Sequence, residues 1–211
     1  MKHYLFDFDG TLVDSMPTYI SVMLRILDEH GISYGDDIIR IITPLGYVNT
    51  AKYYVSLGVP LTEEQIVERM NAYAADEYAH RVMAKERVIE TLRTLKARGD
   101  DLNILTASPH LMLDPCLKRL GIYDLFTNVW SCNDFGTSKS DPAIYHMAAK
   151  KMGVAPSDVI FLDDNLNADK TAKAAGLCVI GVFDESSRDD EGNIRAVADG
   201  YICNFDELLA L

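Results

Sequence analysis

From residue 84 onward, stretches with the apolar spacing of a helix alternate with short apolar runs typical of strands. We expect helices near residues 88–95, 111–120, 142–152 and 168–175, and strands near residues 102–106, 128–131, 159–163, 177–182 and 201–203. Such alternation is typical of a parallel sheet covered by helices on both faces. An earlier apolar run, residues 4–8, predicts one more strand of the same sheet. The fold class expected from this pattern is α/β.

Residues 15–82 have helical spacing and no convincing strand pattern. Apolar residues fall on one helical face between Met16 and Leu27, and a capping box of Thr62 with Gln65 begins another helix. We therefore predict an α/β core built from residues 1–14 and 83–211, with residues 15–82 inserted as an all-helical domain. Two local expectations accompany this division: Asp14 and Ser15 cap the first inserted helix, and residues 184–193 form a solvated loop.

The composition limits the partners of the chain. Its 211 residues include 32 acidic and 20 basic side chains, a formal net charge of -12. Nucleic-acid backbones are bound by clustered Lys and Arg, and the sequence has no such cluster, so we expect no nucleic-acid partner. No stretch approaches about 18 consecutive apolar residues, and the first residues lack a signal-peptide pattern. We expect a cytoplasmic monomer or weak dimer without a membrane partner, whose four cysteines are reduced and mostly buried.

Polar residues follow several of the expected strands. Ligands of open parallel sheets bind outside the carboxyl ends of the strands, so these residues are expected to meet at one edge. The groups placed at this edge by the sequence are Asp7, Asp9, Gly10, Thr11, Thr106, Ser108, Lys139, Asp163 and Asp164. They supply several carboxylates, one ammonium, hydroxyl groups and a glycine-containing turn.

This set of groups suits phosphoryl transfer. Asp7 and Asp9 lie two residues apart, so the period of a strand places both on one side. Two carboxylates this close repel each other unless a cation neutralises them or one holds a proton. With Mg²⁺ present, one carboxylate can act as a nucleophile while the other moves a proton. Lys139 and Thr106 would then bind the nonbridging oxygens of the phosphoryl group.

The sequence resembles the haloacid dehalogenase-like (HAD) hydrolase superfamily in four segments that occur in the family's order. They are Asp-Phe-Asp-Gly-Thr at residues 7–11, Leu105-Thr106, Lys139 within Ser-Lys-Ser-Asp-Pro, and residues 159–164 followed by Asp169. The resemblance covers the whole chain. It implies a Rossmann-like core with a helical cap inserted just after the first segment.

The resemblance also implies roles for individual residues. Asp7 would attack phosphorus to form an aspartyl-phosphate, and Asp9 would protonate the leaving oxygen and then activate water. Mg²⁺ would be bound by Asp7, the backbone carbonyl of Asp9, and Asp164, with Asp163 or Asp169 as an auxiliary acid. The residues expected to bind the phosphoryl group are Gly10, Thr106, Ala107 and Lys139.

Asp9 favours cleavage of a phosphate ester, because relatives that cleave carbon–halogen bonds typically lack an aspartate there. A phosphosugar mutase is the alternative, but the cap histidine of those enzymes corresponds to Tyr19 here, and Asp-Ser-Met-Pro at residues 14–17 resembles phosphoglycolate-phosphatase-like members. We therefore predict a Mg²⁺-dependent phosphatase of a small phosphorylated metabolite. A non-enzymatic phospho-receiver or binding protein is less favoured, because the order of the motifs differs and the helical insertion far exceeds an ordinary loop.

Taken singly, each of these residues also fits a structural role, such as a turn, a helix cap or a surface lysine; their occurrence together favours the phosphatase. Substrate selection is expected in the inserted domain. Its candidate specificity segment is residues 44–50, with Tyr47 and Asn49, followed by Lys52. A plain helix–helix connection explains this segment equally well.

Overall fold

The computed structural model of the protein describes residues 1–210, with the side chains of all of them except Pro44. The chain forms two compact units. The core unit comprises Met1–Asp14 and the chain from Met83 onward, and the helical unit comprises Ser15–Val82. Among the described residues, all strands belong to the core unit and the helical unit contains helices only.

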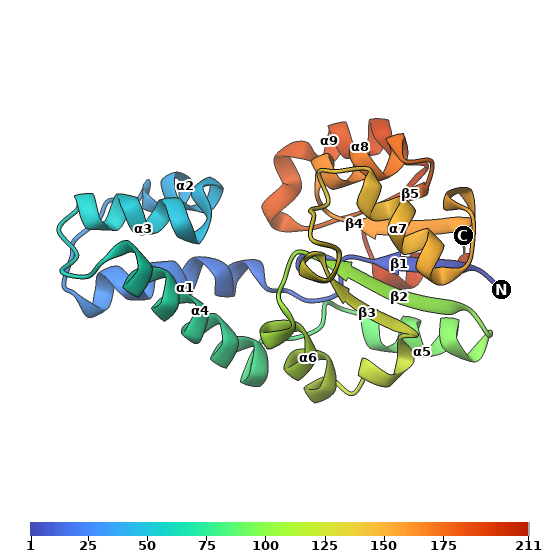
Figure 1. Cartoon of the computed structure of the whole chain (residues 1–211), viewed down its shortest axis with the longest axis horizontal. Helices are drawn as coiled ribbons and strands as arrows, with labels where there is room; N and C mark the ends of the chain where they lie inside the picture. Colours follow the sequence, from blue (N-terminus) through green and yellow to red (C-terminus); the bar gives the residue numbers. More distant parts are fainter. Residues whose placement is uncertain (211) are drawn as a thin grey trace. The chain divides into compact units, whose positions relative to one another are not determined.

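A six-stranded parallel sheet forms the centre of the core unit, with the strand order β3-β2-β1-β4-β5-β6 (Figure 1). The strands are β1 (His3–Phe6), β2 (Asp101–Thr106), β3 (Asn128–Ser131), β4 (Val159–Asp163), β5 (Cys178–Val182) and β6 (Gly200–Ile202). The predicted Rossmann-like parallel sheet is therefore confirmed. Because all strands run in one direction, their carboxyl ends share one edge.

Helices cover both faces of this sheet. Helices α7 (Ala143–Met152) and α8 (Leu166–Ala174) pack on one face, where Leu5 and Phe161 are buried, and α5 (Val88–Ala97) lies on the other (Figure 1). On the α5 face, the ring of Phe6 contacts the rings of Phe126 and Phe205. The remaining segments are α6 (His110–Arg119), α9 (Glu191–Val197), and the 3₁₀ segments η2 (Tyr123–Leu125), η3 (Cys132–Phe135), η4 (Pro156–Asp158), η5 (Glu185–Asp190) and η6 (Phe205–Ala210).

The helical unit consists of α1 (Met16–Glu29), α2 (Ile38–Ile42), η1 (Thr43–Leu45), α3 (Gly46–Ser56) and α4 (Glu63–His80). The apolar face of α1 is buried, and the hydroxyl of Tyr54 on α3 donates to the Met23 carbonyl. The predicted capping box at the start of α4 is present, with reciprocal hydrogen bonds between Thr62 and Gln65. Within residues 1–210, no helix has the length and apolar character needed to cross a membrane.

Several local expectations were wrong in part or in full. β1 ends at Phe6, so Asp7 and Asp9 lie beyond the strand. The segment expected to be a solvated loop forms η5 and the start of α9, because Asp184 caps η5 through the Ser186 amide and Ile194 anchors α9 in the interior. Cysteine burial was overestimated: Cys116 and Cys132 are buried, whereas Cys178 is half-buried and Cys203 exposed.

Ser15 precedes α1 in the capping position, but its side chain does not cap the helix. Its hydroxyl is buried and has no hydrogen-bond partner among the residues described. The backbone at Ser15 is already helical, with ψ of -14°, whereas a capping side chain normally requires an extended conformation. The predicted capping role of this hydroxyl is therefore wrong.

Candidate active site

The candidate active site lies at the carboxyl edge of the sheet, where four segments of the core unit meet. Asp7 follows β1, and its amide donates to the Leu162 carbonyl at 2.8 Å, which continues the β1–β4 pairing by one residue. Thr106 ends β2, and Asp163 ends β4. Lys139 comes from the loop between η3 and α7. The edge predicted from the sequence therefore does collect these side chains.

Lys139 joins two of the acids. Its ammonium lies 2.6 Å from a carboxylate oxygen of Asp7 and 2.7 Å from one of Asp163. The hydroxyl of Tyr145 donates to the Lys139 carbonyl at 3.1 Å and so helps to fix the loop. Burial acts to lower the pKa of Lys139, but the two carboxylates outweigh it and hold that pKa well above its ordinary value. The lysine is therefore a permanent cation beside Asp7.

Three buried carboxylates form a cluster around this lysine. Oxygens of Asp7, Asp163 and Asp164 all lie within 4.8 Å of one another. Burial, and then repulsion from Asp163 and Asp9, raises the pKa of Asp7 to about 7 although Lys139 opposes the shift. Burial and the neighbouring acids also raise the pKa of Asp164 well above its ordinary value. Such a cluster is strained when ionised and is relieved by a cation.

The two adjacent acids of the cluster differ in their hydrogen bonds. Both oxygens of Asp163 are engaged, one by Lys139 and the other by the Asn165 amide at 2.8 Å. Asp164 accepts a hydrogen bond from the Thr11 hydroxyl at 3.1 Å through Oδ1, and its Oδ2 faces the backbone of Gly10. Asp164 is therefore the better placed of the two to bind a cation, with Asp163 holding Lys139.

Gly10 is required by the close approach of its backbone to Asp164. A Cβ atom at this position would lie 2.5 Å from Asp164 Oδ2, and the backbone φ is +74°, a region that favours glycine. The Gly10 amide donates to the Val13 carbonyl at 3.0 Å within the turn. The contribution of Gly10 visible in this structure is therefore space for Asp164.

A second chain of hydrogen bonds connects Asp9 to the end of β2. The Ser108 hydroxyl donates to Asp9 Oδ2 at 2.5 Å, and the Ser108 amide donates to Thr106 Oγ1 at 3.1 Å. Thr106 is buried, whereas Ala107 is exposed at the tip of the same loop. Because a hydroxyl both donates and accepts, Thr106 can still donate its proton to a bound anion. Ser108 thus connects Asp9 to the loop after β2 that carries Thr106 and Ala107.

Asp169 lies behind the cluster on α8. Its side chain is fully buried, and neither of its carboxylate oxygens has a hydrogen-bond partner among the described residues. Burial, followed by repulsion from Asp163, raises the pKa of Asp169 to about 8. A carboxyl with this pKa is protonated at neutral pH in the metal-free protein.

The predicted specificity residues lie in the other unit. Tyr47, Asn49 and Lys52 are on α3, where the ring of Tyr47 stacks on that of Tyr19 with 5.2 Å between ring centroids. The Asn49 side chain donates to the Leu45 carbonyl at 3.1 Å. These contacts are local to the helical unit, and the role of these residues in specificity stays a prediction.

Sequence reasoning gave no role to several residues that contact the site. Thr11 and Ser108 were placed at the edge, but their hydrogen bonds to Asp164 and Asp9 depend on tertiary contacts. Lys85 and Asp184 were missed altogether; their ion pair, at 2.9 Å, lies beside the Gly10 turn. Asp184 stands two residues after the end of β5, so the rule that selected Asp163 could have selected it as well.

Comparisons with known proteins agree with this geometry. A family model described as "Haloacid dehalogenase-like hydrolase" matches residues 4–182. A phosphoglycolate phosphatase of Haemophilus influenzae is 30% identical over 189 residues, covering 84% of this chain and 83% of that protein. The pyrophosphatase PpaX of Bacillus velezensis is 29% identical over 181 residues, covering 84% and 81%. A beta-phosphoglucomutase candidate from Thermotoga maritima has a similar fold, with a TM-score of 0.85, 22% identity and coverage of 100% and 98%.

Proposed function

The chain belongs to the haloacid dehalogenase-like hydrolase family, and we propose that it is a Mg²⁺-dependent phosphatase that hydrolyses a small phosphorylated metabolite through an aspartyl-phosphate intermediate. It is a phosphoric monoester hydrolase, as the phosphatases related to it in sequence indicate. The observation that carries the mechanism is the position of Asp7: a buried carboxylate 2.6 Å from Lys139, in a cluster with Asp164, on the same turn as Asp9.

The carboxylate cluster fits Mg²⁺. Its ligand atoms are oxygens, which Mg²⁺ prefers, and the raised pKa values of Asp7 and Asp164 reflect burial and mutual repulsion that a dication would relieve. Asp7, Asp164 and the Asp9 carbonyl would hold the ion. When bound, it would neutralise the carboxylates and the charge that develops on the phosphoryl oxygens.

Asp7 supplies the nucleophile. Lys139 favours its ionised form, and an ionised Asp7 oxygen attacks phosphorus while the bond from phosphorus to the ester oxygen breaks. Asp9 donates its proton to that leaving oxygen, which departs as an alcohol. The Ser108 hydroxyl fixes the orientation of the Asp9 side chain for this transfer.

Hydrolysis of the aspartyl-phosphate then uses the same residues in reverse roles. Asp9, now ionised, takes a proton from water, and the water oxygen attacks phosphorus. The bond between phosphorus and the Asp7 oxygen breaks, which releases inorganic phosphate and regenerates the carboxylate. Lys139, the Thr106 hydroxyl and the Ala107 amide bind the phosphoryl oxygens throughout, and Gly10 leaves room for Asp164 beside them.

The proposal also covers substrate selection and location. Tyr47, Asn49 and Lys52 of the helical unit, acting as a cap, are proposed to select the metabolite, and Asp163 and Asp169 to support the cluster. All four cysteines are present as thiols rather than disulfides, as expected of a protein in a reducing compartment. This supports our proposal that the enzyme is cytoplasmic. We also propose that it is a monomer or weak dimer.

The test is phosphate release from a panel of phosphorylated metabolites, with Mg²⁺ and with a chelator, by the wild type, Asp7→Asn and the exposed control Asp158→Asn. We expect release by the wild type and the control with Mg²⁺, and a loss of about 10³-fold or more for Asp7→Asn. Equal turnover by Asp7→Asn would remove the nucleophile assignment. Isomerisation of a sugar phosphate without phosphate release would favour the mutase, and absence of turnover on every ester would contradict the phosphatase.

A further inference from the structure

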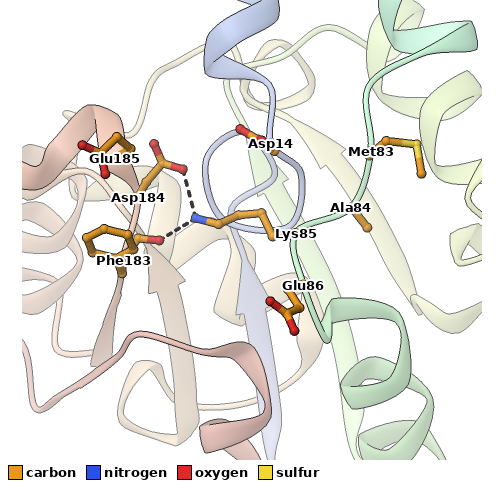
Figure 2. A pocket seen from close by; sticks show the side chains of 8 residues that line it. All are labelled: Asp14, Met83, Ala84, Lys85, Glu86, Phe183, Asp184 and Glu185. Atoms are coloured by element: carbon orange, nitrogen blue, oxygen red, sulfur yellow. Dashed lines mark hydrogen bonds and ion pairs between the residues drawn. The ribbon is translucent and has the colours of Figure 1, made fainter.

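Lys85 forms a three-way connection next to the candidate active site. It lies in the core unit, three residues after the end of the helical unit. Its ammonium donates to the Gly10 carbonyl at 2.6 Å, the Phe183 carbonyl at 2.5 Å and Asp184 Oδ2 at 2.9 Å. A lysine ammonium has three donors, so all of them are used. Figure 2 shows the Lys85 side chain extending toward Phe183 and Asp184.

The position of the Gly10 carbonyl affects the orientation of residues in the candidate active site. Gly10 directly follows Asp9, and its backbone lies against Asp164, where a Cβ atom would come within 2.5 Å of Oδ2. The next residue, Thr11, donates to Asp164 Oδ1. Because the peptide group is planar, a hydrogen bond to the Gly10 carbonyl also fixes the plane that leads into Thr11. Lys85 is thus one peptide group away from the contacts that orient Asp164.

We propose that Lys85 is a positioning residue for the phosphatase reaction: by holding the Gly10 carbonyl against the loop after β5, it keeps Asp164 oriented toward the cation and Asp9 toward the leaving oxygen. This inference rests on the proposed function of the same site. It assigns to the Lys85 side chain a role that acts through the Gly10 carbonyl.

A purely structural role for this ammonium is the competing explanation, and the surrounding backbone argues against it. The Asp14 amide donates to the Met83 carbonyl and the Lys85 amide to the Leu12 carbonyl, both at 3.0 Å. These bonds hold the segment in place without the Lys85 side chain. Asp184 likewise keeps two hydrogen bonds from Ser186 when the ammonium is removed. The segment should therefore remain folded in a variant that lacks the amine.

The first experiment compares Lys85→Met with Lys173→Met, each in the full chain. Lys173 pairs with Asp199 at the surface, away from the Gly10 turn, so its variant also loses one ion pair. We expect kcat of Lys85→Met to fall about 10- to 100-fold with little change in KM, and the Mg²⁺ concentration for half-maximal thermal stabilisation to rise about 10-fold. Lys173→Met should retain wild-type values of all three quantities.

The second experiment uses chemical rescue. Lys85 lines a pocket of about 320 Å³ with Asp14, Phe183 and Glu185 (Figure 2), so a small amine can reach the space vacated in Lys85→Ala. Propylamine replaces the atoms that this substitution removes and is protonated at neutral pH, as lysine is. We expect it to restore kcat in a saturable manner, whereas uncharged 1-propanol should not.

The outcomes separate this inference from the proposed function. A folded Lys85→Met protein with wild-type kcat and wild-type response to Mg²⁺ would overturn the positioning role while leaving the phosphatase intact. If the wild type hydrolyses no ester, the proposed function fails, but the Mg²⁺ titration still decides whether Lys85 orients Asp164. If Lys85→Met does not fold, rescue of Lys85→Ala by propylamine decides, and equal rescue by 1-propanol would count against the proposal.

Discussion

The acidic side chains at the two ends of the parallel sheet differ in the hydrogen bonds that they accept. At the amino end, Asp101 accepts hydrogen bonds from Thr127, Asn103 and His3 at 2.6, 2.9 and 3.2 Å. At the carboxyl end, Asp169 is fully buried and has no hydrogen-bond partner among the described residues. Both acids belong to the core unit, Asp101 on β2 and Asp169 on α8, so the difference is not one between domains.

The pKa directions express the same contrast. Burial acts to raise the pKa of Asp101, but hydrogen bonds from Thr127, Asn103 and His3 outweigh burial and lower it. Burial dominates at the other end and raises the pKa values of Asp7, Asp164 and Asp169. Acids whose pKa values are raised by burial and by neighbouring charges are typical of functional sites. The acid at the amino end is thus stabilised by its own neighbours, whereas the acids at the carboxyl end have raised pKa values, which supports the proposal that they bind a cation.

The largest expected effect concerns the backbone at the carboxyl end. Gly10→Ala places a Cβ atom 2.5 Å from Asp164 Oδ2 at a φ of +74°, so Asp164 must move. We expect kcat to fall about 100-fold or more, as for misplaced catalytic groups in general. Gly153→Ala is the matched control, because its φ of +76° imposes similar strain but nothing lies within 4 Å. Equal activity of the two variants would show that the Gly10 turn does not position the site.

The second prediction concerns Mg²⁺ and pH. In the metal-free protein, the folded chain holds protons on Asp7 and Asp169 that the unfolded chain has released, so its free energy of unfolding should fall as the pH rises from about 4 to about 8. Mg²⁺ at about 100 times its dissociation constant should restore about 2.7 kcal/mol. Because its ligands must be deprotonated, the gain should be larger near pH 8 than near about pH 5.

Thermal melts with Mg²⁺ or with chelator across this pH range measure the effect. Asp7→Asn serves as the control, since it removes one proposed ligand and the charge repulsion together. A stabilisation by Mg²⁺ that is independent of pH, or unchanged in Asp7→Asn, would show that the cluster is not the cation site.

The third prediction tests whether the amino end is structural only. Asp101→Asn replaces one of the two accepting carboxylate oxygens by an amide nitrogen, which is a donor. That nitrogen then faces either the Thr127 hydroxyl or the donors of His3 and Asn103. We expect the free energy of unfolding to fall by about 2 kcal/mol, with kcat/KM of the folded protein unchanged. Denaturant unfolding and steady-state kinetics measure the two quantities. A fall in kcat/KM without loss of stability would contradict a purely structural role for the amino end of the sheet.

The smallest expected effect is at Asp169. Asn at this position is neutral, as Asp169 is when protonated, so Asp169→Asn should match the wild type in stability at about pH 3, where Asp169 is protonated in both the folded and the unfolded chain. From about pH 4 upward, the unfolded wild type releases a proton that the folded metal-free wild type retains, so the variant should become the more stable of the two, by about 1 kcal/mol near about pH 5. The difference should stop growing above the Asp169 pKa of about 8. Asp158→Asn, at an exposed site, should show no such pH dependence. Equal stability of wild type and Asp169→Asn at high pH would indicate that Asp169 gains a partner on ionisation.

Much of the fold could be predicted from local pattern. The strands at 128–131 and 159–163 were placed at their observed bounds, and the capping box at Thr62 was identified, because each depends on neighbours within a few residues. The polar residues of segment 184–193 predict a loop, whereas the structure forms η5 and the start of α9 there, because Ile194, directly after the segment, is buried. The residue type of Ser15 predicts a helix cap, but its backbone is already helical.

The amino-acid sequence by itself determined which polar groups arrive at the carboxyl edge, since strand ends and motif residues are local features: Asp7, Thr106, Lys139 and Asp163 were identified in this way. Only the tertiary structure decided which acids accept hydrogen bonds that outweigh burial and which have raised pKa values. It also decided which side chain supports the Gly10 turn. Lys85 meets its acceptors across 75 and 98 positions of the chain. Contacts over such distances follow from the packing of the whole unit. They correspond to no periodicity, capping pattern or residue spacing from which the sequence could predict them.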